Sequence, residues 1–66
     1  MRQWLIEMRK NAGKTQAELA MMASITQPSY NAIEAGKNNP KPETAQRIAK
    51  ILNFKWTRFY EEGTDE

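Results

Sequence analysis

Cysteine and histidine are both absent from this chain of 66 residues. Without cysteine the chain can form neither a disulfide nor a thiolate metal site, and it has no thiol nucleophile. Without histidine it lacks the usual general base and the most common metal ligand. The remaining residues offer no pairing of a nucleophile with a base, so we expect no enzyme, no bound metal, no cofactor and no small-molecule substrate.

Long apolar runs are missing as well. No stretch approaches the roughly 18–20 apolar residues of a membrane span, and the N-terminus has no signal-peptide pattern. Hydrophobic residues make up 39% of the chain and the mean hydropathy is −0.83, which leaves room for a modest core. We therefore expect one small, soluble, cytoplasmic domain that does not bind membranes.

Negative charge is scarce outside the last six residues. Residues 1–60 carry ten lysines and arginines against four glutamates, a formal charge of +6. The other four acidic side chains lie within residues 61–66 and predict a short, solvated acidic tail. A basic body of this kind favours a polyanionic partner, with nucleic acid as the first candidate.

Strand signals are nearly absent, because β-branched residues are few and apolar positions do not alternate. Turn residues instead divide the chain into five segments of helical periodicity. We expect these helices over residues 2–12, 15–22, 26–36, 42–53 and 55–61. The first should present Leu5, Met8 and Ala12 on one apolar face. The chain is therefore predicted to be all-α.

Local signals mark the ends of the predicted helices. Gly13 can end the first helix in a left-handed conformation, and Asn53 can do the same for the fourth. Thr15 and Glu18 have the spacing of a capping box at the start of the second helix. Thr26 is the expected N-cap of the third.

The second and third helices are separated by residues 23–25 alone. A turn this short cannot let two helices run antiparallel along their length, so they must cross steeply. This is helix-turn-helix geometry, in which the second helix projects into the DNA major groove. At 100° per residue, Gln27, Asn31 and Ala32 share one small, mostly polar side of the third helix, whereas Tyr30 and Ile33 lie on the apolar side.

A wider set of residues carries a family resemblance. The set comprises Leu5-x-x-Met8-Arg9, Gly13-x-Thr15-Gln16-x-Glu18-Leu19-Ala20, Ile25-Thr26-Gln27, Ile33-Glu34-x-Gly36, Pro40 and Ile48-Ala49-x-x-Leu52. Over about residues 4–60 the chain resembles the Xre family, which includes phage lambda-type repressors and Cro-like regulators. The resemblance implies a compact five-helix, lambda repressor-like DNA-binding domain over residues 1–60, followed by the acidic tail.

Three positions depart from the family pattern. Ser24 stands where glycine is common in the turn, so a left-handed conformation there would carry strain. Tyr30 replaces the usual isoleucine or valine, and its hydroxyl must find water or a partner. Ala32 occupies a position that often carries a longer base-contacting side chain, which predicts fewer hydrogen-bonding readers.

The start of the third helix supplies the candidate base contacts, which are Gln27, Pro28, Asn31 and Ala32. The amide of Gln27 can pair with adenine N6 and N7, and it agrees with the resemblance. Pro28 and Ala32 offer apolar surface suited to a thymine methyl group. Asn31 can read a base or bind a phosphate.

Candidate phosphate contacts surround that helix. They are Lys14, Thr15, Gln16, Ser29, Lys37, Asn38 and Lys41. Gln16 and the amides beside it resemble the phosphate clamp of the family, since a helix N-terminus favours anions. Ser29 has helix packing as its alternative role, Asn38 has base contact, and each lysine has that of a solvated surface charge.

Arg9 and Glu34 are interpreted as a structural ion pair. A bare carboxylate near the end of a helix that approaches phosphates would be repelled, and the resemblance pairs it with the arginine of the first helix. Trp56, Phe59 and Tyr60 leave two interpretations open. In the first, Phe54, Trp56 and Phe59 close the core over the first and fourth helices, and in the second, part of this aromatic patch forms an isologous dimer contact.

Together these observations predict a sequence-specific, double-stranded-DNA-binding transcriptional regulator that reads the major groove with its third helix. With no room in 66 residues for an effector domain, we expect a repressor of phage, prophage or antitoxin-like autoregulatory type, or the N-terminal part of one. It should act as a homodimer on an inverted-repeat operator. The alternative is a helical protein–protein adaptor that keeps the fold without binding DNA.

Overall fold

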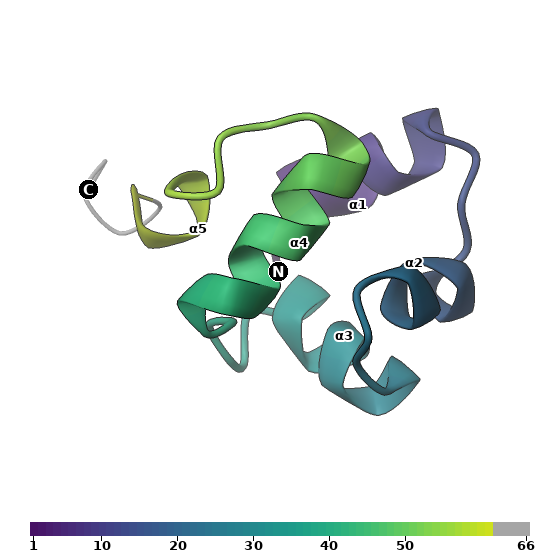
Figure 1. The fold of residues 1–66 in the computed structure, drawn as a ribbon, viewed down its shortest axis with the longest axis horizontal. Coiled ribbons are helices and arrows are strands. Elements are labelled where there is room, and N and C mark those ends of the chain that lie inside the picture. Colours follow the sequence, from purple (N-terminus) through teal and green to yellow (C-terminus); the bar gives the residue numbers. More distant parts are fainter. Residues whose placement is uncertain (62–66) are drawn as a thin grey trace.

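The computed structural model describes residues 1–61, which form five helices and, over that range, no strand (Figure 1). The helices are α1 (Gln3–Asn11), α2 (Gln16–Met22), α3 (Gln27–Glu34), α4 (Pro42–Leu52) and α5 (Arg58–Glu61). The all-α prediction is confirmed. Residues 62–66 of the predicted tail lie outside the described residues, and Glu61, assigned to that tail, is the last residue of α5.

Most helix ends follow the local signals. Thr15 Oγ1 accepts from the Glu18 N–H at 3.1 Å, and the Thr15 N–H donates to Glu18 Oε1 at 2.8 Å, so the capping box is formed. Thr26 Oγ1 accepts from the Ser29 N–H at 3.2 Å and caps α3. Asn53 ends α4 with a φ of 63°. These contacts satisfy backbone groups that a helix end leaves open.

The fifth helix is shorter than predicted, because it begins at Arg58 rather than at Lys55. The N–H groups of Arg58, Phe59 and Tyr60 donate to carbonyls three residues earlier, at distances of 3.0, 3.3 and 2.9 Å. Bonds of this kind form tight turns, and here they connect the residues before Arg58 to the first turn of α5. The residues before α5 therefore wind as turns and deliver its aromatic side chains to the core.

The core contains side chains from all five helices, and in Figure 1 α4 passes in front of α1 and lies above α3. Its buried side chains are Leu5, Leu19, Ala20, Ala23, Tyr30, Ile33, Ala45, Ile48, Leu52 and Phe59. Ala12 departs from its predicted place on the apolar face of the first helix. It is exposed because α1 ends one residue earlier and the chain turns away there.

Aromatic rings fill the end of the core between α1 and α5. The ring of Trp4 lies 5.2 Å from that of Phe54 and 5.3 Å from that of Phe59. Phe59 is only 1% exposed, so it closes the core and offers no surface to a second copy, contrary to its suggested part in a dimer contact. Trp56 is half-buried and Tyr60 is 40% exposed.

Candidate nucleic-acid interface

The connection between α2 and α3 has the predicted short form. In Figure 1 the two helices are neighbours whose axes cross. Ser24 takes the left-handed conformation with a φ of 61°, and the Ile25 N–H donates to the Ala20 carbonyl at 2.9 Å. The left-handed conformation of Ser24 lets the chain change direction within three residues. Ser24 carries the strain expected of a residue other than glycine in this conformation.

Helix α3 has one buried and one exposed side. Tyr30 and Glu34 are buried, with exposed fractions of 0% and 3%, whereas Gln27, Pro28 and Asn31 are exposed. An α-helix with its side chains is roughly 10–12 Å across, and the major groove of B-DNA is about 12 Å wide, so a helix such as α3 can enter it. Among the four predicted base contacts, Ala32 has the least exposed side chain, because it is half-buried.

The buried side of α3 is anchored through Glu34. Arg9 Nε donates to Glu34 Oε2 at 2.6 Å, so Arg9 and Glu34 form an ion pair between α1 and α3. The Tyr30 hydroxyl donates to the same oxygen at 2.7 Å, which is the partner that this buried hydroxyl requires. Gln16 Nε2 donates to Glu34 Oε1 at 2.8 Å. We call Arg9, Gln16, Tyr30 and Glu34 the Glu34 network.

The Glu34 network shifts the ionisation of its members. Burial alone would raise the pKa of the Glu34 carboxyl, but the hydrogen bonds from Arg9, Gln16 and Tyr30 outweigh burial and lower it. Burial raises the pKa of the Tyr30 hydroxyl, and the hydrogen bond to Glu34 adds to this effect. The hydrogen bond to Glu34 raises the pKa of Arg9. Glu34 is therefore an anion within the fold at neutral pH.

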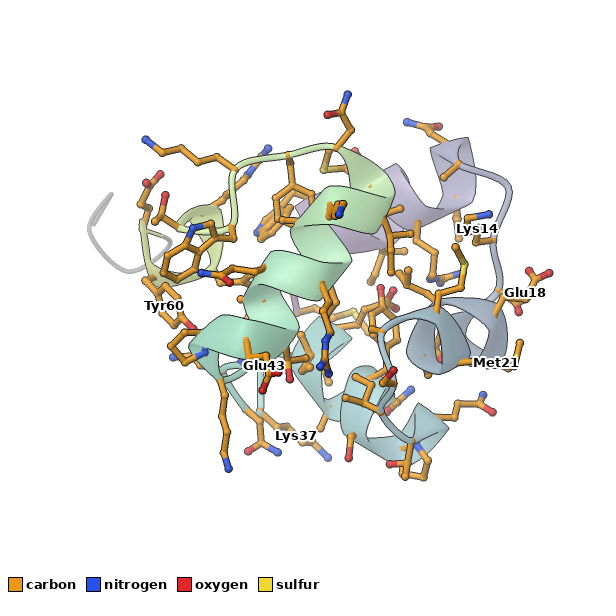
Figure 2. All side chains as sticks on the ribbon, viewed as in Figure 1. Lys14, Glu18, Met21, Lys37, Glu43 and Tyr60 are labelled. Atoms are coloured by element: carbon orange, nitrogen blue, oxygen red, sulfur yellow. The ribbon has the colours of Figure 1, made fainter. Side chains whose placement is uncertain are left out.

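Residues at the start of α2, which are predicted to form a phosphate clamp, also make contacts within the protein. Gln16 is half-buried, and its amide bonds Glu34 on one side and Asn31 on the other. The side chain and N–H of Thr15 both bond Glu18 in the capping box. Lys14 lies in the connection between α1 and α2 (Figure 2). The structure thus brings Gln16 to the base of α3, and Lys14, like Gln16, is half-buried.

The loop from α3 to α4 contributes the other predicted phosphate contacts. Lys37, Asn38 and Lys41 are exposed, and Lys37 lies at the lower edge of the molecule beside the end of α3 (Figure 2). A groove of about 240 Å³ separates this loop from α3. Its lining includes Ser29, Asn38 and Lys41 over a floor that contains Ile33. Three predicted phosphate contacts, one from α3 and two from the loop, therefore line one hollow.

Comparison with known proteins assigns the chain to a family. A helix-turn-helix family model matches residues 5–59. The chain belongs to the Xre-type helix-turn-helix family. It is 38% identical over 66 residues to the HTH-type transcriptional regulator YqaF of Bacillus subtilis (strain 168), with all of this chain and 87% of that protein covered. No solved structure matches the chain significantly.

A second relative comes from an archaeon. An HTH-type transcriptional regulator of Methanothermobacter thermautotrophicus is 40% identical over 52 residues, covering 79% of this chain and 75% of that protein. The family places this Xre-type chain among DNA-binding transcriptional regulators, and its fold is of the lambda repressor-like, five-helix kind. Within residues 1–61, no helix is long and apolar enough to cross a membrane.

One anchor of this Xre-type fold was missed by the sequence analysis. Arg2 is 4% exposed, and its guanidinium donates to the Ile33 carbonyl, to the Asn38 carbonyl at 3.1 Å and to Asn39 Oδ1. It also lies 5.4 Å from the centre of the Phe59 ring. Arg2 thus ties the end of α3 to the loop that carries the predicted phosphate contacts. Its only sequence signal was a charge beside an apolar helix face.

Proposed function

We propose that this chain is a sequence-specific repressor that binds double-stranded DNA with α3 in the major groove. The observation that carries the proposal is the exposed side of α3, where Gln27 and Asn31 present amides one helical turn apart. An amide both donates and accepts, which matches the paired donor and acceptor on the major-groove edge of adenine. Pro28 adds apolar surface suited to a thymine methyl group.

The positions of the basic residues support the same orientation on DNA. Lys41 lines the groove beside α3 together with Ser29 and Asn38, and Lys37 is exposed in the same loop. We assign these side chains to phosphate contacts, together with Lys14 and Thr15 before α2. Phosphate contacts position a reading helix in the groove and supply most of the sequence-independent affinity.

The proposed binding unit is a homodimer on an inverted repeat. The longest dimension of one chain is 32 Å, and half-sites of this fold class lie about 34–36 Å apart, so one chain suits one half-site. Tyr60 and Trp56 form an edge-to-face pair at 5.8 Å beside α5, and Tyr60 is 40% exposed. We place the dimer contact there, with Phe59 behind it as support.

Repression requires only that the operator be occupied, and the proposed interface can occupy it. We therefore favour a repressor, and we propose the phage, prophage or antitoxin-like autoregulatory type. The alternative is an adaptor of this fold that binds a protein and no DNA.

The proposal is tested by selecting bound sites from a random DNA pool and then comparing two variants on the selected site. Gln27→Ala should weaken that site by roughly 1–3 kcal/mol and relax the preference at one base pair per half-site. Lys37→Ala should weaken all sequences alike and reduce the salt slope by about 0.9 per phosphate lost. Equal weakening of every sequence by Gln27→Ala would contradict base reading by Gln27. A pool from which wild-type protein selects nothing would favour the adaptor.

A further inference from the structure

A chain of hydrogen bonds leads from the buried Arg9 to the exposed side of α3. Arg9 bonds Glu34, whose other oxygen accepts from Gln16 Nε2 at 2.8 Å. Gln16 Oε1 then accepts from Asn31 Nδ2 at 3.3 Å. The first three residues belong to α1, α3 and α2, and Asn31 is exposed on α3. A candidate reader of DNA is thus bonded, through one amide, to the ion pair in the core.

The charge on Glu34 determines which way the Gln16 amide faces. An ionised carboxylate can accept hydrogen bonds but cannot donate them. Because Arg9 and Tyr30 both donate to Glu34, the carboxylate is held in its charged form. Gln16 must therefore turn its NH₂ group towards Glu34. Its carbonyl oxygen then points away from the core, towards Asn31.

The orientation of Gln16 in turn determines that of Asn31. A carbonyl oxygen accepts only, so Asn31 must offer Nδ2–H to Gln16 Oε1. Among residues 1–61 this is the one hydrogen bond made by the Asn31 side chain. Its oxygen Oδ1 and its second Nδ2–H remain available on the exposed side of α3. Asn31 therefore presents an acceptor beside a donor, in an order imposed from inside the protein.

We propose that this imposed order makes Asn31 select adenine over guanine in the base pair that it reads. The inference rests on the proposed DNA-reading function of α3. Adenine presents a donor at N6 and an acceptor at N7, which match Oδ1 and the second N–H of Asn31. Guanine presents two acceptors, O6 and N7, so Asn31 Oδ1 would face a carbonyl oxygen. An unconstrained Asn31 could turn its NH₂ group towards guanine, whereas the bond to Gln16 opposes that rotation.

Asn31 is the contacting residue in this scheme, and Gln16 is a positioning residue. The two roles predict different consequences for binding. Removing the Asn31 side chain abolishes the preference at one base pair. Removing the Gln16 side chain leaves the Asn31 amide in place but frees its orientation, so guanine becomes acceptable. A phosphate contact by Gln16 would instead change the affinity for all sequences by one factor.

The test measures the affinity ratio between adenine and guanine at the pair where Asn31→Ala loses its preference. We expect the wild-type protein to favour adenine by about tenfold or more. In Gln16→Ala the same ratio should fall to about twofold or less, with the preference at the Gln27 pair retained. Lys37→Ala is the matched control, since it should weaken both duplexes equally and keep the ratio. Gln16→Met, which keeps the side-chain length, should repeat the Gln16→Ala result if the alanine variant folds poorly.

The outcomes separate this inference from the function on which it rests. An unchanged adenine-to-guanine ratio in both Gln16 variants would overturn the positioning role, and so would a wild-type preference for guanine at that pair. If the wild-type protein selects no sequence at all, the DNA-reading proposal fails and this inference fails with it. A measurement without DNA adds an independent check. Hydrogen exchange of the Asn31 side-chain amide should quicken in Gln16→Ala, and an unchanged rate would contradict the bond on which the inference depends.

Discussion

The two ends of the domain are held together by different physics. At the α2–α3 end, the Glu34 network joins three helices through charged and neutral hydrogen bonds within 2.6–2.8 Å. At the α5 end, the rings of Trp4, Phe54 and Phe59 pack with centroids 5.2–5.6 Å apart. Hydrogen bonds specify direction, whereas ring packing mainly fills volume and removes apolar area from water.

The two kinds of packing match the roles proposed for the two ends, which are DNA reading by α3 and core closure or dimer contact at α5. A helix that reads bases needs its side chains held at defined angles, and the Glu34 network provides directional anchors for α3. A surface that closes the core, or contacts a second copy, needs shape and apolar area. A small domain can therefore use a polar cluster where side-chain orientation matters and an aromatic cluster where burial of apolar area matters. Among residues 1–61, no buried side-chain polar atom lacks a hydrogen-bond partner.

The largest expected effect comes from the aromatic end. Phe59→Ala should lower the free energy of unfolding by about 3–5 kcal/mol, because it leaves a cavity in a fully packed site. Denaturant unfolding followed by tryptophan fluorescence measures this loss. Tyr60→Ala, at a side chain that is 40% exposed, is the control and should cost clearly less. Equal losses in the two variants would contradict the assignment of Phe59 to the core.

Glu34→Ala should have the next largest effect, with a loss of about 3 kcal/mol in unfolding free energy. The substitution leaves Arg9 and the Tyr30 hydroxyl without their common acceptor. Glu43→Ala provides the control, because it breaks only the exposed pair with Arg47 and should cost about 0.5 kcal/mol or less. A double-mutant cycle between Arg9 and Glu34 that shows no coupling would refute the ion pair as an anchor.

Tyr30→Phe isolates one hydrogen bond of the Glu34 network. Its expected cost is about 2 kcal/mol, because the lost bond is buried and its acceptor is charged. Tyr60→Phe removes a bond to the Pro40 carbonyl at the half-buried edge of α5, and should cost about 0.5–1 kcal/mol. Thermal unfolding of both variants gives the comparison. A larger loss from Tyr60→Phe would reverse the contrast between the two ends.

The two ends of the domain should also differ in how pH affects their contribution to stability. The Glu34 network contains a carboxyl group whose pKa is shifted, whereas the cluster at the α5 end consists of aromatic rings. Because folding lowers the pKa of Glu34, the unfolded chain binds the proton first as the pH falls. The resulting stability is complete above the ordinary pKa of 4.5 and is lost as the pH falls through the lower folded value. In Glu34→Gln, the free energy of unfolding should decrease less steeply as the pH falls. A smaller pH dependence should remain from Glu18, whose pKa is lowered chiefly by its backbone hydrogen bond with Thr15. Phe59→Ala should leave the pH dependence of the unfolding free energy unchanged. A weaker pH dependence in that variant would contradict the assignment of this dependence to Glu34.

Local signals predicted much of the fold. The Thr15 and Thr26 caps and the left-handed Asn53 lie within a few residues of the groups that they satisfy, so spacing alone revealed them. The start of the fifth helix was wrong by three residues, because the turns before Arg58 also place apolar side chains at spacings of three. Short-range periodicity does not separate tight turns from the first turn of an α-helix.

Long-range contacts were the harder part of the site. The bonds of Arg2 to the Ile33 and Asn38 carbonyls join residues 31 and 36 positions apart, and backbone acceptors carry no side-chain signature. The fold places the Gln16 amide between Glu34 and Asn31, and the sequence indicated neither of these contacts. The sequence could place each of these residues on a helix, but only the packing of three helices shows which polar groups meet.

The central claim is that the exposed side of α3, held by the Glu34 network, reads a DNA sequence. Its most direct test is a fluorescence-anisotropy titration of the wild-type protein with the selected operator duplex and with a scrambled duplex of equal composition, over several salt concentrations. The account predicts that the operator binds about a thousandfold or more tightly at physiological salt, and that both affinities fall steeply as salt rises. Equal affinities for the two duplexes at every salt concentration would contradict it.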